Sequence, residues 1–255
     1  MAQAPALKLA PYERFDCQGC AQCCRAPWQI HLQPEESRRL SLRVIDAEAG
    51  CPFLENSRCQ LHNCGKPVSC QVFPFIFTAT PEGVEVELSY FCPSVRSGSG
   101  RLLEEQRDSL QRLLTQIPAP QEWSGPFLVR PPDLTLGWTG YRLWEAELLR
   151  LLERGSPLAV LESAIRGLET VSDFWQADES QLFPDCPQGP PQPGLLLRYL
   201  SSLIRRKFLL RAPSLLTGLG ILHSWLGSDP GEAEIEAWEL RVTHGKPDWE
   251  QLGGG

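Results

Sequence analysis

The sequence lacks an excess of positive charge. Its 255 residues include 24 lysines and arginines against 31 aspartates and glutamates, which gives a formal net charge of −7 and a pI near 5.2. Proteins that hold a nucleic-acid backbone need a basic surface, so we expect no nucleic-acid partner. The one basic cluster, Arg205-Arg206-Lys207, lies between apolar residues. It is expected to form a solvated helix face that needs no ligand.

Long apolar runs are also missing. No window reaches the roughly 18 consecutive apolar residues that a membrane helix requires. The Tyr12-Glu13-Arg14 segment interrupts the N-terminal stretch in which a secretory signal would have its apolar core. We therefore expect no membrane partner and a cytoplasmic protein. The cytosol is reducing, and stable disulfides are uncommon there.

Histidine is scarce, with four residues, whereas cysteine is abundant, with ten. Nine of these cysteines lie between residues 17 and 92, and four form the run C-x-x-C-x-x-C-C at Cys17, Cys20, Cys23 and Cys24. Thiols this dense are either oxidised to disulfides or shared by a metal, and in a reducing compartment they indicate metal. A disulfide framework and buried thiols without a ligand are the alternatives, and the second applies best to Cys186.

The spacing of the cysteines fits two kinds of metal centre. Thiolates two residues apart can point at one ion, as zinc sites and iron–sulfur clusters both require. Cys17, Cys20 and Cys23 match the first three positions of a bacterial ferredoxin run, but Cys24 follows at once, so a fourth ligand must be remote. Adjacent cysteines rarely serve one mononuclear ion, which leaves two metals or a cluster open. The remote candidates, from stronger to weaker, are Cys51 and Cys92, each followed by proline, then His62, and last Cys64 and Cys186.

The composition changes near residues 97–100, and we predict two modules there. Residues 1–100 should form a small cysteine-rich α+β metal-binding module, and residues 101–255 a helical module, so the fold class is mainly α. A helix is expected from Pro34 to about Ile45, because proline and then Glu35 and Glu36 make a good helix start. In the second module, helices are expected within residues 102–114, 141–152, 158–175, 194–210, 213–226 and 232–244, with loops at 118–132 and 183–193.

A β-hairpin is predicted from residues 73–78 and 84–90, which flank turn residues at 80–83. The second strand alternates apolar and polar residues, so Glu85 and Glu87 are expected on its solvent face. Residues at equal distances from a tight turn are cross-strand neighbours. Cys70 and Cys92 would therefore meet at the open end of this hairpin.

These motifs resemble a known family. The order C-x-x-C-x-x-C-C-R, then Cys51-Pro52-Phe53-Leu54, Cys59, Lys66-Pro67-x-x-Cys70 and Cys92-Pro93 is similar to the CxxCxxCC zinc- or iron-chelating family. These are the YkgJ-type cysteine-cluster proteins, which include flagellin lysine N-methylases. The resemblance covers about residues 12–100. It implies the metal ligands Cys17, Cys20, Cys23, Cys24, Cys51, Cys59, Cys70 and Cys92.

Three functions follow as hypotheses. The favoured one is an iron–sulfur or zinc protein of unassigned reaction. The resemblance also implies a protein lysine N-methylase that uses S-adenosylmethionine on a protein substrate, so whether the chain is an enzyme is left open. A zinc-stabilised protein-interaction module is the third. No catalytic residue is assigned. The motif Gly218-Leu219-Gly220 lies in an apolar helical pattern, so we expect it to have a packing role rather than to bind a nucleotide-like ligand.

Overall fold

The computed structural model describes residues 5–62, 64–120, 122–123, 125–186, 194–228 and 230–244. The fold is mixed α+β, with 46% helix and 15% strand; small sheets lie in the N-terminal half and helices dominate the C-terminal half. The chain separates into two compact units, Met1–Gln121 and Glu122–Gly255. Among the helices of the described ranges, none is long and apolar enough to cross a membrane.

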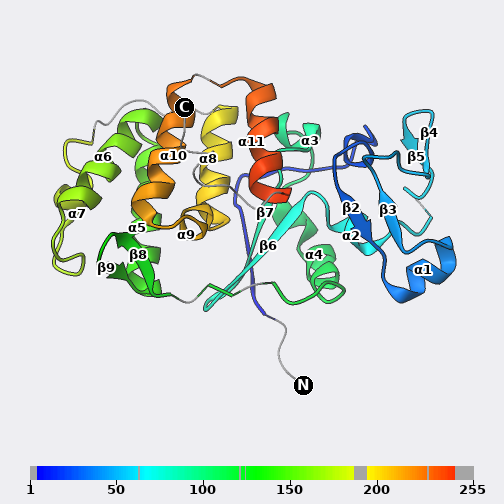
Figure 1. Cartoon of the computed structure of the whole chain (residues 1–255), viewed down its shortest axis with the longest axis horizontal. Coiled ribbons are helices and arrows are strands. Elements are labelled where there is room, and N and C mark those ends of the chain that lie inside the picture. Colours follow the sequence, from blue (N-terminus) through cyan, green and yellow to red (C-terminus); the bar gives the residue numbers. More distant parts are fainter. Residues whose placement is uncertain are drawn as a thin grey trace. The chain divides into compact units, whose positions relative to one another are not determined.

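The first unit contains short elements joined by long connections (Figure 1). Its helical segments are η1 (Gln22–Cys24), α1 (Pro34–Leu40), α2 (Val68–Val72), α3 (Pro93–Arg96), η2 (Leu103–Gln106) and α4 (Arg107–Leu114). Its strands are β1 (Leu7–Leu9), β2 (Gln29–His31), β3 (Val44–Asp46), β4 (Leu54–Glu55), β5 (Arg58–Cys59), β6 (Phe75–Thr80) and β7 (Gly83–Leu88). They form a three-stranded sheet in the order β1-β7-β6 and the pairs β2-β3 and β4-β5.

The core of the first unit lies between this three-stranded sheet and α4. Leu7 of β1 and Val84 and Val86 of β7 pack against Leu110 and Leu114 of α4. Because α4 covers the sheet, the first unit extends to residue 121, beyond the joint predicted at residue 100.

The predicted hairpin is present as β6 and β7, which pair in register from Phe75 with Leu88 to Thr80 with Gly83. Gly83 has φ +129°, and a Cβ there would overlap the backbone carbonyl of Ala6, so the turn requires glycine. The expected solvent face is wrong, since Glu85 and Glu87 are only 6% and 3% exposed. β7 is the central strand of its sheet and is covered on both faces. The alternation of polar and apolar residues along it therefore does not mean that one face is exposed to solvent.

The helix predicted from Pro34 is confirmed at its start and wrong at its end. The Glu36 carboxylate accepts a hydrogen bond from the Gln33 amide (2.8 Å), which completes a capping box. The helix stops at Leu40, because Ser41 adopts the left-handed conformation with φ 55°. Strand β3 follows at Val44–Asp46, where the β-branched Val44 and Ile45 favour a strand, and it pairs with β2.

The second unit is helical apart from one hairpin. Its elements are β8 (Phe127–Arg130), β9 (Leu134–Leu136), α5 (Trp138–Leu152), α6 (Pro157–Thr170), α7 (Glu179–Leu182), α8 (Leu195–Arg205), α9 (Phe208–Arg211), α10 (Leu215–Gly227) and α11 (Glu232–His244). The helices predicted for this region are therefore present, with three corrections. The loop expected at 118–132 contains β8, α6 ends before the 64% exposed Trp175, and Lys207 (φ 61°) divides the expected 194–210 helix. Residues 187–193 of the second expected loop lie outside the described residues.

The basic cluster at 205–207 is not a solvated face. Arg206 and Lys207 are 3% and 0% exposed. Arg206 donates two hydrogen bonds to Glu239 of α11, at 2.6 and 2.7 Å. Lys207 donates to both carboxylate oxygens of Glu145 of α5, at 2.9 and 3.0 Å. These residues therefore join helices within the second unit.

Glycines at helix contacts let the second unit pack closely. A Cβ on Gly218 would lie 3.0 Å from Cδ2 of Leu209, which confirms the expected packing role of this glycine. Gly167 of α6 is tighter still, because a Cβ there would overlap the Leu182 carbonyl and come within 2.9 Å of the Leu182 Cα. The obstacle is backbone, which cannot rotate away.

The substitution Gly167→Ala is therefore expected to destabilise the second unit by about 1–3 kcal/mol through overpacking. Thermal unfolding followed by circular dichroism measures the effect. Gly220→Ala is the matched control, since Gly220 also lies inside a helix but nothing is within 4 Å of its added Cβ. That variant should gain about 0.5–1 kcal/mol from helix propensity. Shifts of the same sign in both variants would contradict the packing account.

Candidate metal centre

The cysteine run enters a short 3-10 turn, η1. Ala21 adopts the left-handed conformation (φ 60°), and the Cys24 amide donates to the Ala21 carbonyl at 3.0 Å. The thiols of Cys23 and Cys24 lie within hydrogen-bonding reach of each other. This hydrogen bond from Cys24, together with the positive charge of Lys66, lowers the pKa of Cys23 to about 6. The same bond, with burial, raises the pKa of Cys24, so Cys23 is the thiolate of the pair.

Cys51 and Cys59 are held by the small β4-β5 hairpin. Cys59 pairs with Leu54 in the ladder, and the Leu54 amide donates to the Cys51 carbonyl at 3.0 Å. Asn56 and Ser57 form the connecting turn, both with positive φ, as two-residue hairpin turns require. The hairpin therefore places two cysteines that lie eight residues apart in the sequence on one small scaffold.

Arg25 ties this hairpin to the cysteine run. Its guanidinium donates to the Ser57 hydroxyl at 2.8 Å and to the Cys20 carbonyl at 3.4 Å. Thiolate charge on Cys51 and Cys59 acts on Cys24, where it adds to the rise in pKa. The η1 turn and the β4-β5 hairpin therefore bring Cys24, Cys51 and Cys59 into one electrostatic neighbourhood.

Cys70 joins that neighbourhood from α2. The amide of Val68 at the start of α2 donates to the Glu36 carboxylate at 2.7 Å, which fixes the helix against α1. Burial raises the pKa of Cys70 to about 12, the charge of Lys66 opposes this, and thiolate charge on Cys23, Cys51 and Cys59 adds to it. Burial of the thiol is thus the largest effect on the pKa of Cys70, followed by the charge of Lys66 and then by cysteines assigned to the site.

Cys92 lies at the other end of the β6-β7 hairpin from its turn. It is the N-cap of α3 and is buried, which raises the pKa of its thiol, and thiolate charge on Cys20 adds to the effect. The ladder ends where the Ser89 amide donates to the Pro74 carbonyl at 2.7 Å. The prediction that Cys70 and Cys92 are cross-strand neighbours is therefore wrong, because both lie beyond the ladder in short helical segments.

Cys17 and Cys20 are exposed, and side chains beside Cys17 anchor the segment that carries them. Asp16 accepts hydrogen bonds from the Arg101 side chain at 2.8 and 2.9 Å and from its amide at 3.0 Å. These bonds hold the pKa of the Asp16 carboxyl below its usual value. Gln18 donates to the Ser99 hydroxyl at 3.2 Å. The chain on both sides of Cys17 is thereby attached to the segment that follows α3.

The lower-ranked candidates are Cys64, His62 and Cys186, and of these His62 lies beside a proposed ligand, since its amide donates to the Cys59 carbonyl at 3.1 Å. Cys64 is exposed, and its thiol donates to the Gln60 carbonyl at 3.0 Å. His62 is exposed as well. Cys186 belongs to the second unit, where burial raises the pKa of its thiol. These observations leave Cys64, His62 and Cys186 below the eight cysteines proposed as metal ligands.

The donor chemistry of the first unit fits a thiolate-bound metal. All ten cysteines are described residues and are free thiols. Within the described part of the chain, no group of three or more His, Cys, Asp or Glu side chains has an arrangement that could hold a metal ion as it stands. Metal would therefore have to draw the sulfurs closer. Several of these thiols lie in connecting loops or in short strands, such as Cys59 in the two-residue strand β5. Binding of a metal and local folding of such segments can be coupled.

Two residues that matter for this site, Arg25 and Lys66, were quoted in the motifs without a role. Arg25 connects the cysteine run with the β4-β5 hairpin, and Lys66 supplies positive charge to Cys23 and Cys70. The sequence signal that could have found these two residues is a basic residue close to a cysteine. Arg25 directly follows Cys24, and Lys66 lies four residues before Cys70. A nearby cation stabilises a thiolate, which is the form that binds metal.

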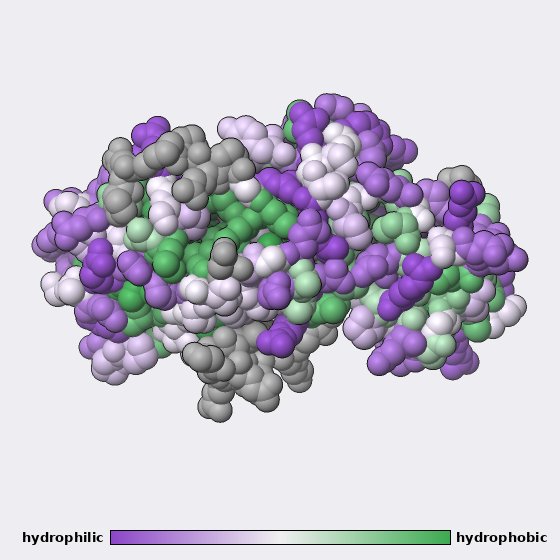
Figure 2. All heavy atoms as spheres, turned by 90° about the horizontal axis from the view of Figure 1, so that it is seen from above, coloured by the Kyte–Doolittle hydropathy of each residue, from purple (hydrophilic) through white to green (hydrophobic). Residues whose placement is uncertain are grey.

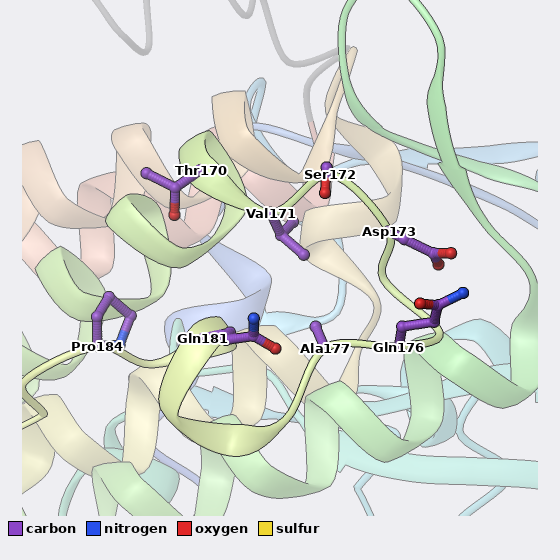
Figure 3. A pocket seen from close by; sticks show the side chains of 8 residues that line it. All are labelled: Thr170, Val171, Ser172, Asp173, Gln176, Ala177, Gln181 and Pro184. Carbon is purple, nitrogen blue, oxygen red and sulfur yellow. The ribbon is translucent and has the colours of Figure 1, made fainter.

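Two hollows of about 350 Å³ each lie in the second unit. The first is polar, and its labelled side chains come from the end of α6, from the loop between α6 and α7, and from α7 and the segment after it (Figure 3). It is lined by Thr170, Val171, Ser172, Asp173, Gln176, Ala177, Gln181 and Pro184. The second is mainly apolar and is lined by Ser156, Pro157, Leu158, Gly194, Leu196, Leu197 and Leu226. Figure 2 shows apolar side chains gathered on a face of the helical unit. No cysteine lines either hollow.

Comparisons with protein-family models, with curated proteins and with solved structures find no match to this chain. The resemblance to the CxxCxxCC family therefore stays a prediction from the motifs.

Proposed function

We propose that the protein binds zinc or an iron–sulfur cluster through the cysteine thiolates of its first unit, with no reaction assigned. One observation carries the proposal. Cys24 and Cys70, which come from different segments, both lie near Cys23, Cys51 and Cys59, since charge on those three thiols raises the pKa of Cys24 and of Cys70. A thiol whose pKa is raised stays protonated in the absence of a cation. A bound metal would favour the thiolate form and release those protons.

The ligands would be drawn from Cys17, Cys20, Cys23, Cys24, Cys51, Cys59, Cys70 and Cys92. A bound zinc ion would supply structural cross-links, and an iron–sulfur cluster would supply electron transfer. Two basic residues of the chain would support metal binding, one through its charge and the other by fixing the position of the hairpin. Lys66 favours the thiolate form of Cys23, and Arg25 fixes the hairpin against the cysteine run.

A zinc-stabilised interaction module is a second candidate, and the short elements of the first unit favour it. Strands β4 and β5 have two residues each, and α1 has no buried residue. Such segments bury too little apolar surface to be stable alone, and a structural metal can replace a core there. The lysine N-methylase hypothesis rests on the family resemblance and stays a prediction. Binding of S-adenosylmethionine by the purified protein tests it.

Metal analysis after anaerobic purification tests the proposed function. We expect either iron with a broad visible absorption band or stoichiometric zinc without colour. The double variant Cys51→Ser, Cys59→Ser should lose metal, since it removes two of the five clustered thiols. Cys64→Ser is the matched control, because Cys64 is an exposed cysteine of the same unit to which no ligand role is given. Folded wild-type protein without metal, or equal metal content in the two variants, would overturn the proposal.

A further inference from the structure

Strand β6 forms one edge of the three-stranded sheet in the first unit, beside the central strand β7 (Figure 1). Val84 and Val86 of β7 turn their backbone groups toward the β1 side, where the Val84 amide donates to the Ala6 carbonyl at 2.9 Å. In an antiparallel ladder, two directly opposite residues either bond to each other or both turn their groups outward. The partners of these valines, Ala79 and Phe77, therefore direct their N–H and C=O groups away from β7.

Phe75, Phe77 and Ala79 form a row of hydrogen-bonding groups along the outer edge of β6. Phe75 belongs to this row because the alternation has a period of two residues. In the described part of the chain, no hydrogen bond is made to the backbone groups of these three residues. Each of them is half-buried rather than covered. The edge therefore keeps donors and acceptors for one more strand.

β6 also lacks the features that normally keep a strand edge from pairing with another chain. Proteins usually protect such an edge with charged side chains, proline or a bulge. The sequence of β6, Phe-Ile-Phe-Thr-Ala-Thr, contains no charge and no proline, and its register with β7 has no bulge. The opposite edge of the same sheet differs, because β1 carries Lys8 and its Leu7 carbonyl accepts a hydrogen bond from Arg107 at 2.9 Å.

We infer that β6 pairs antiparallel with β6 of a second copy of this chain, about a two-fold axis beside Phe77. The edge is complementary to itself, because Phe75 and Ala79 are equally far from Phe77 along the strand. In this register Phe77 faces its own counterpart and Phe75 faces Ala79 of the second copy, so each pair can exchange two backbone hydrogen bonds. Both edges are then used up, and assembly stops at a dimer.

The side chains and the charge of the chain favour this arrangement. Phe77 meets its counterpart as a cross-strand aromatic pair, and the large Phe75 meets the small Ala79. The first charged residue after β6 is Glu82, and its two copies would lie at opposite ends of the paired strands. A chain with a net charge of −7 repels its own copy, so an uncharged edge is where two copies can approach. No cysteine takes part, and the pairing is independent of the proposed function.

Sedimentation equilibrium of the full chain over a range of concentrations tests the pairing. We expect a reversible shift from the 28.5 kDa monomer toward twice that mass. Ala79→Pro removes an outward N–H that makes no bond within the chain, so the hairpin should remain while the dimer dissociation constant rises about tenfold or more. Ala79→Val is the matched control, because it keeps the N–H, and its dissociation constant should stay within about twofold of the wild-type value.

Opposite charges placed at the two-fold axis test the register. Phe77→Lys and Phe77→Glu should each be monomeric alone, because like charges would then face each other across the axis. An equal mixture of the two variants should form a mixed dimer. Circular dichroism of each variant checks its fold, since Phe77 also packs against the core of the first unit. Hydrogen exchange of residues 75–80 in the wild type should slow as the dimer forms.

Three results would overturn the pairing. A 28.5 kDa monomer at every concentration up to about 1 mM would show that the edge does not bind a second copy, and would leave it to an extended segment of another protein. A dimer that Ala79→Pro does not weaken would place the contact on another surface. Open-ended growth beyond the dimer would contradict the two-fold arrangement. Metal content is measured separately, so none of these results bears on the proposed function.

Discussion

The substitution Lys207→Met is expected to lower the free energy of unfolding by about 3 kcal/mol, because the fully buried Glu145 carboxylate loses one of its two cationic partners, the other being Arg142. Lys207 is fully buried, and its ammonium donates to both oxygens of Glu145 at 2.9 and 3.0 Å. The Tyr141 hydroxyl also donates to Glu145 at 2.8 Å, and Arg142 forms an ion pair with it. The ammonium lies 5.8 Å from the centroid of the Trp138 ring. Urea unfolding measures the loss.

Two further variants separate burial from charge. Arg150→Met removes the partly exposed ion pairs of Arg150 with Glu147 and Glu179, and each pair of this kind contributes less than about 1 kcal/mol. The double variant Lys207→Met, Glu145→Gln should recover part of the lost stability, since the buried carboxylate that lost its ammonium partner is then removed as well. A Lys207→Met loss no larger than that of Arg150→Met would contradict the structural role given to this pair.

Local signals in the sequence predicted several elements well. Proline followed by two glutamates placed the start of α1, and the Thr80–Gly83 turn placed the β6-β7 hairpin. Helical spacing of apolar residues predicted α5, and a uniformly apolar stretch predicted α10. Each of these depends on residues within a few positions of one another, so sequence alone contains the information. The end of α1 was missed because a left-handed serine has no strong signature.

Burial of charge could not be predicted in the same way. Arg206 and Lys207 appeared to be a solvated face because their partners, Glu239 and Glu145, are 33 and 62 residues away. Glu85 likewise alternates with apolar residues as a solvent-facing strand would, yet it lies in a central strand. The same limit applies to the candidate site. Spacing indicated thiolate ligands, but the hydrogen bonds that position their segments, such as those of Arg25 and Asp16, arise only in the folded chain.

Cys17 and Cys20 are expected to resist alkylation although both side chains are exposed. The thiolate is both the nucleophile and the metal ligand, so a thiolate bound to metal is not free to attack an alkylating reagent. Cys64 is also exposed and is given no ligand role. We expect Cys17 and Cys20 to react roughly tenfold more slowly than Cys64, or slower still. Burial cannot produce this difference, which makes exposed cysteines more informative than Cys24 or Cys92.

The most direct measurement of thiolate metal binding is therefore a time course of iodoacetamide modification, mapped residue by residue by mass spectrometry on anaerobically purified protein. The account predicts rapid modification of Cys64 and slow modification of Cys17 and Cys20, with all three reacting alike after the metal is removed. Equal rates at these three exposed cysteines in the protein as purified would contradict it.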